Sequence, residues 1–177
     1  MNRAITMDTF RKQGQALITA LVASLVVVTV SAVGSRAVAE PSKPLSTCLP
    51  ETPLPAGELH RILMLQSANK VSDAPWRPSA WYGTWHAADE LCHTLLVLSV
   101  EGATADVIYS YGRGTYPPAF ERHKATIARD GALRFNTSWG ASLVYTRKQG
   151  SATSILATYT DTTGRWTIEL RRIDNVK

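Results

Sequence analysis

A chain of 177 residues is long enough to build one hydrophobic core and short for two. Its composition, 45% hydrophobic and 19% charged residues, excludes a disordered protein. The formal net charge is +5, but residues 1–39 carry four basic residues against Asp8, which leaves only +2 for the remainder. Because no basic run or basic stripe between aromatic residues follows, we expect no nucleic-acid partner.

The N-terminal segment, residues 1–39, has the layout of a secretory signal. An uncharged apolar run over residues 16–33 follows two basic residues, and the small-x-small triplet Ala37-Val38-Ala39 offers a cleavage site. The run is also just long enough to span a membrane uncleaved. We expect a cleaved signal peptide or a signal anchor, with the rest exported to the periplasm or the extracellular space. Contact with the membrane is then confined to residues 16–33 of an uncleaved chain.

Residues 40–79 read as a proline-rich tether. Five prolines between residues 40 and 57 favour extended structure. Apolar residues then recur at helical spacing, which indicates a short helix over residues 57–67, although the same run fits a strand. Two further prolines predict a loop over residues 73–79.

From residue 80 to residue 177 apolar and polar residues alternate, which is the period of half-buried strands. Trp81, Gly83 and Trp85, for example, share one face of the first strand. Glycine-bearing turn signals separate the runs. We expect about eight strands, near residues 80–87, 91–100, 103–111, 122–129, 132–137, 141–148, 152–160 and 165–173.

These strands predict an all-β fold, an up-and-down antiparallel barrel of about eight strands, because closure removes exposed sheet edges. The side chains expected to face inward are Trp81, Trp85, Val107, Tyr109, Leu133, Phe135, Leu143, Tyr145, Ile155, Tyr159, Trp166 and Ile168. An interior this rich in aromatic residues is either filled by its own side chains or holds one small apolar ligand, and the sequence leaves both open.

The triplet Gly83-Thr84-Trp85 resembles the G-x-W motif that opens the first strand of the calycin group, the lipocalin and avidin-like barrels. Arg171 or Arg172 is similar to the basic residue that packs over that Trp and closes the barrel. The resemblance covers residues 80–173. The aromatic interior face favours a non-enzymatic binding module, a calycin-like barrel that takes a small apolar or amphipathic molecule through a mouth formed by the loop at residues 112–119. The ligand-binding residues expected on the interior or the mouth are Trp81, Trp85, Tyr109, Tyr111, Arg113, Tyr116, Tyr145, Tyr159 and Trp166.

The chain also resembles periplasmic barrels that inhibit secreted metalloproteases, which combine a signal peptide, an N-terminal trunk, a G-x-W strand and an early Cys in the second strand. Cys92 stands at about that place. This likeness implies a second possibility, a role as an exported protease inhibitor or as an accessory subunit of an envelope complex. In that case the tether would be the working element, since an extended segment lies in a partner's groove at low entropic cost.

Cys48 and Cys92 are the two cysteines of the chain, and in an oxidising compartment they predict a disulfide. The alternative is two separate buried or free thiols. A disulfide would pin the tether to the second strand.

Five residues around the first turn superficially resemble a metal or Cys-His site, namely His86, Asp89, Glu90, Cys92 and His93. Adjacent strand residues point to opposite faces, however, so Cys92 and His93 cannot ligate one ion without a bulge, and we expect a solvated hairpin turn instead. His60 and His123 have no catalytic partner nearby in sequence. Since no nucleophile motif or apolar carboxylate pair is present, we expect neither enzymatic activity nor a cofactor or metal.

Overall fold

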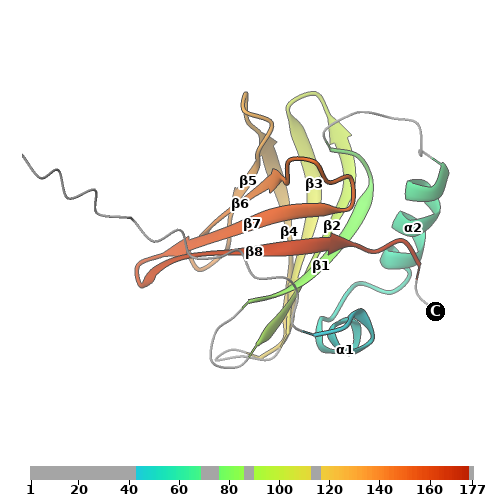
Figure 1. The fold of residues 1–177 in the computed structure, drawn as a ribbon, viewed down its shortest axis with the longest axis horizontal. Coiled ribbons are helices and arrows are strands. Elements are labelled where there is room, and N and C mark those ends of the chain that lie inside the picture. The colour runs from blue at the N-terminus through green and yellow to red at the C-terminus, as the bar shows by residue number, and fades with distance from the viewer. Residues whose placement is uncertain (1–42, 69–75, 86–89, 113–116, 176–177) are drawn as a thin grey trace, which may run out of the picture. The chain divides into compact units, whose positions relative to one another are not determined.

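The computed structural model describes residues 43–68, 76–85, 90–112 and 117–175 (Figure 1). The predicted targeting segment therefore lies outside the described residues. So do His86, Asp89, Arg113 and Tyr116. Within the described residues, neither helix is long and apolar enough to cross a membrane.

Eight antiparallel strands form a closed barrel in which each strand pairs with its neighbours in sequence and the last pairs with the first (Figure 1). The strands are β1 (Ser79–Trp85), β2 (Leu91–Glu101), β3 (Thr104–Tyr111), β4 (Ala119–Ile127), β5 (Leu133–Asn136), β6 (Ser142–Arg147), β7 (Ser154–Asp161) and β8 (Gly164–Arg172). The predicted fold class, an all-β up-and-down barrel, is confirmed.

The meander gives the barrel two ends with different connections. At one end, called here the mouth, β1, β3, β5 and β7 end and β2, β4, β6 and β8 begin. The other, called the base, carries the turns at 102–103, 128–132 and 148–153, together with the start of β1 and the end of β8. Side chains on the inward face of each strand line the space between the two ends.

One buried cluster fills the barrel and contains all twelve side chains predicted to face inward, with Tyr159 and Trp166 partly buried against the rest. The strand β2 is buried on both faces from Cys92 to Leu98, unlike β4, where half-buried or buried residues alternate with exposed ones. This difference explains the continuous apolar run in β2, because its outward face is covered by the helices that precede the barrel.

Those helices are α1 (Leu45–Glu51) and α2 (Glu58–Ala68), and both lie against β1 and β2 (Figure 1). A second apolar cluster, around Ile62 of α2 and Leu96 of β2, lies beneath them on the outside of the barrel. Helix α2 occupies the range in which the sequence indicated a short helix. Helix α1 lies within the run of prolines and was not predicted.

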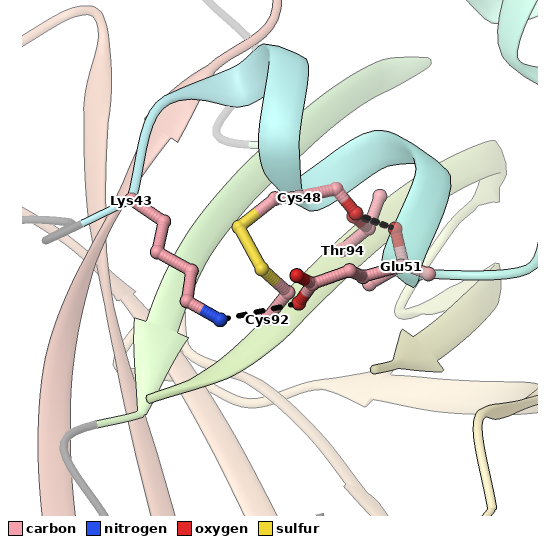
Figure 2. Close-up of a disulfide and its surroundings, with 6 residues drawn as sticks. Lys43, Cys48, Glu51, Cys92 and Thr94 are labelled. Carbon is pink, nitrogen blue, oxygen red and sulfur yellow. Dashed lines mark hydrogen bonds and ion pairs between the residues drawn. A yellow bond between two sulfur atoms is a disulfide. The ribbon is translucent and has the colours of Figure 1, made fainter. Parts of the chain in front are cut away.

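A disulfide between Cys48 and Cys92 joins α1 to β2, so the predicted pairing is confirmed (Figure 2). The Cα atoms are 5.2 Å apart and both residues are fully buried. At the end of α1 the Thr52 hydroxyl lies 2.9 Å from the Cys48 carbonyl and 3.0 Å from the Thr94 hydroxyl of β2. Helix α1 is thus attached to the barrel wall both covalently and by a buried hydrogen bond.

The base of the barrel is covered by Trp76, which precedes β1. This residue is only 2% exposed and belongs to the interior cluster. Its indole N–H donates to the carbonyl of Gly131, in the turn between β4 and β5, at 2.8 Å. Trp76 therefore fixes a large apolar side chain over the base and satisfies its own polar group.

The seam between β1 and β8 closes the barrel, and Gln66 of α2 reinforces it. Its amide nitrogen donates to the Ile173 carbonyl at 2.8 Å, and its amide oxygen accepts from the Ala80 N–H at 3.1 Å. Between these two residues the Ile173 N–H donates to the Ala80 carbonyl at 2.8 Å. A buried side-chain amide from the helix therefore satisfies backbone groups at the point where the two strands meet.

Gly83 lies in the middle of this seam. A Cβ atom there would lie 2.8 Å from the Glu169 carbonyl oxygen and 2.5 Å from the Leu170 side chain, so only glycine lets β8 approach this closely. The triplet that resembles G-x-W occupies the last three residues of β1, not its start. Arg172 and Arg171 pair across the seam with Trp81 and Tyr82, and the register does not place them opposite Trp85.

Candidate functional site

The feature that distinguishes the mouth half of the barrel is a connected network of aromatic rings. Every strand contributes at least one ring, and neighbouring ring centroids are 4.6–6.2 Å apart. The members are Trp85, His93, Tyr109, Tyr111, His123, Phe135, Trp139, Tyr145, Tyr159 and Trp166. We call this set the ring network.

Burial within the ring network decreases from the barrel interior towards the mouth. His93 and Tyr145 are fully buried, whereas Trp139, in the connection between β5 and β6, is 44% exposed. The indole N–H of Trp139 donates to the Tyr159 hydroxyl at 3.1 Å, which ties this exposed ring to β7. The network therefore extends from fully buried rings in the interior to a solvent-exposed aromatic side chain at the mouth.

His93 is a fully buried polar side chain of the ring network. Its Nε2 atom lies 3.1 Å from the Tyr145 hydroxyl. Burial lowers the pKa of His93 from 6.5 to about 3, because the protonated imidazole would be stripped of water. The ring is consequently neutral near pH 7. Residue 93 lies within β2, as the predicted strand over residues 91–100 has it, but its side chain is fully buried against Tyr145 and does not belong to a solvated turn.

Trp85 lies beside His93 with ring centroids 5.3 Å apart in an edge-to-face arrangement. Among the described residues, the indole Nε1 of Trp85 and the Nδ1 of His93 are buried without a hydrogen-bond partner. The Trp85 indole lies near the Tyr109 phenol and acts to lower the pKa of Tyr109, although the two groups do not meet the geometry of a hydrogen bond. The net effect on Tyr109 is a raised pKa, caused first by burial.

The rim of the mouth carries Glu121 and His123 of β4. One carboxylate oxygen of Glu121 lies 2.9 Å from the His123 Nε2 and accepts the backbone N–H of Ser138 at 3.1 Å. The other oxygen accepts the Ser138 hydroxyl. Because His123 and the Ser138 hydroxyl bind the same carboxylate and not each other, they do not form a nucleophile–base pair. The carboxylate also helps burial to raise the pKa of Tyr111.

Most of the sequence-predicted site residues lie in the ring network. Trp85, Tyr109, Tyr111, Tyr145, Tyr159 and Trp166 are members. Trp81 belongs to the interior cluster but lies towards the base, where its indole donates to the Ser79 hydroxyl at 2.9 Å. Arg113 and Tyr116 lie outside the described residues. The sequence reasoning missed His93 and Trp139; for His93 the alternation of Leu91, His93 and Leu95 carried the signal.

In the parts of the chain that the structure describes, no group of three or more His, Cys, Asp or Glu side chains is arranged to hold a metal ion. Cys92, which in the sequence belongs to a cluster that resembles a metal site, forms the disulfide with Cys48. Cys92 and His93 do point to opposite faces of β2, one towards α1 and the other into the barrel.

No protein-family model matches this chain, no curated protein matches it in sequence, and no solved structure matches it. What it does must therefore be inferred from its own geometry.

Proposed function

We propose that this chain is an exported, non-enzymatic binding module, a calycin-like barrel that takes a small planar or amphipathic molecule at its mouth. The observation that carries the proposal is the ring network, which runs without a break from fully buried rings to the 44% exposed Trp139. Aromatic surfaces with a few convergent polar groups are typical of small-molecule sites. Trp76 over the base leaves the mouth as the route of entry.

Export is supported by two independent features. The uncharged run over residues 16–33, with a small-x-small triplet after it, fits a signal peptide or signal anchor. The fully buried Cys48–Cys92 disulfide fits an oxidising compartment such as the periplasm, because cytosolic proteins rarely keep structural disulfides.

A role in protein interaction through the tether is the weaker candidate. It needs an extended segment that is free to enter a partner's groove. In the described part of that segment, residues 45–51 form a helix that is bound to β2 through Cys48. No contact among the described residues favours this role over ligand binding.

The proposal is tested by titrating the purified protein with a panel of planar aromatic, acyl-chain and steroid compounds and following tryptophan fluorescence. The variant Trp139→Ala removes the exposed ring of the network, and we expect Kd to rise roughly fivefold to tenfold, the scale of one aromatic contact. Phe120→Ala is the matched control, because Phe120 is also 44% exposed but is not a member of the ring network.

Two outcomes would count against the proposal. One is the absence of binding by every compound in the panel, together with no co-purifying small molecule in native mass spectra. The other is an equal loss of affinity in the Trp139→Ala and Phe120→Ala variants, which would place the binding surface outside the mouth.

A further inference from the structure

Two buried nitrogen atoms of the ring network have unmet hydrogen-bonding capacity. Within the described residues, the Trp85 Nε1 and the His93 Nδ1 are the buried side-chain polar atoms without a partner. His93 is fully buried and Trp85 is 7% exposed. Buried polar groups in folded proteins are nearly always paired, because leaving one unpaired forfeits its hydration without return. Two such atoms on rings that touch each other therefore require an explanation.

Strand pairing brings the two rings together. Gly83, two residues before Trp85 in β1, pairs with His93 of β2. The ring centroids are 5.3 Å apart, and the His93 ring also stacks on Tyr145 at 5.8 Å. The two nitrogens therefore belong to neighbouring rings, and we infer that they serve one ligand group.

The chemistry of His93 decides which kind of ligand group fits. The Tyr145 hydroxyl lies 3.1 Å from His93 Nε2. We assign the hydroxyl as the donor, because a phenol O–H is a stronger acid than a neutral imidazole N–H, and this assignment puts the ring proton on Nδ1. Trp85 Nε1 is a donor in every state. Both unpartnered atoms are therefore N–H donors, and the missing partner is a hydrogen-bond acceptor.

The charges at the rim indicate whether the acceptor is neutral or anionic. The Glu121 carboxylate helps to raise the pKa of Tyr109 and of Tyr111, and the Asp161 carboxylate interacts with Tyr159. An anionic ligand would be repelled by these carboxylates at the rim, so the charges there favour a neutral acceptor.

Building on the proposed function, we propose that the deep part of the site recognises a neutral oxygen acceptor, such as a ring-conjugated carbonyl, on a planar ligand. The His93 Nδ1–H and the Trp85 Nε1–H are the donors. The surrounding rings select planarity, and the two donors select the acceptor.

The test uses two probes of nearly the same shape, acetophenone and α-methylstyrene, which differ by C=O against C=CH₂. The protein is purified after expression of the full chain. We expect it to bind acetophenone about tenfold more tightly than α-methylstyrene, because the alkene leaves the buried donors unpaired. The double variant His93→Phe/Tyr145→Phe keeps both rings and removes one of the two donors, so the preference for acetophenone should fall to about threefold, with the Trp85 Nε1–H remaining. Phe120→Ala, outside the ring network, is the control and should keep the full preference.

A readout on the unmodified protein covers the case in which these variants do not fold. In long-range ¹H–¹⁵N spectra the proton of His93 should reside on Nδ1, and acetophenone, but not α-methylstyrene, should shift the His93 Nδ1–H and Trp85 Nε1–H signals. If both probes bind equally, the proposed function stands and the acceptor inference fails. If neither probe binds while another compound of the panel does, the acceptor inference fails and the proposed function stands; if no compound of the panel binds, both fail. A proton on Nε2, or an undiminished preference in the double variant, overturns the role of His93.

Discussion

Removing the disulfide should weaken the fold by an amount that its position determines. Cys48 and Cys92 are 44 residues apart, and closing a loop of that size stabilises a folded chain by about 4 kcal/mol in the chain-entropy model. The unfolding entropy of a domain of about 130 residues is near 0.27 kcal/mol per degree, so this corresponds to a fall in Tm of about 15 °C. We therefore expect that fall in the double variant Cys48→Ala/Cys92→Ala.

The assay is thermal unfolding followed by circular dichroism, with and without a reducing agent. Reduction of the unmodified protein should give a fall close to that of the double variant, since both release the same loop. Lys43→Ala is the matched control, because Lys43 lies on the same segment and forms a part-exposed ion pair with Glu51, worth about 0.5 kcal/mol. A double variant that melts within about 3 °C of the unmodified protein would refute the view that the disulfide holds helix α1 in place.

Three further changes test the barrel itself. Gly83→Ala should lower the free energy of unfolding by about 2 kcal/mol or more in urea titrations, because the new Cβ meets Leu170 and a backbone oxygen of β8. An unchanged free energy would mean that β1 and β8 do not pack this closely at Gly83. Gln66→Leu should lower the free energy of unfolding by about 2 kcal/mol, because it leaves two backbone groups without their partner, while Met64→Ala on the exposed face of the same helix should cost nearly nothing. Equal effects would contradict the role of Gln66 at the seam. Folding lowers the pKa of His93 from 6.5 to about 3. The neutral buried ring therefore contributes fully to the free energy of unfolding above pH 6.5, and this contribution is lost as the pH falls towards 3. Between about pH 7 and pH 5 the unmodified protein should lose about 2 kcal/mol more than His93→Phe, and identical pH profiles would show that His93 is hydrated.

The strands could be predicted because their signals are local. Alternating side chains define each strand, and Gly102, Gly131, Gly140 and Gly150 adopt the positive φ angles that their turn positions suggested. Strand alternation also placed the inward-facing side chains correctly, since a barrel buries one face of every strand.

The features that the sequence did not reveal depend on distant contacts. Helix α1 has seven residues, one of them Pro50, and is too short to form without the disulfide and the barrel wall beneath it. Trp76 and Gln66 lie outside the barrel strands, and their roles arise from partners 55 and 107 residues away. His93 was read with its charged neighbours in the turn, although its position in the alternation belonged to the interior.

The central claim, that ligands enter at the mouth and contact the ring network, is tested most directly by labelling the five tryptophans with 5-fluorotryptophan. Trp85, Trp139 and Trp166 belong to the ring network, whereas Trp76 and Trp81 lie towards the base. On titration with acetophenone, the fluorine signals of the first three should shift and those of Trp76 and Trp81 should stay. Shifts confined to Trp76 and Trp81, or no shift up to about millimolar ligand, would contradict the claim.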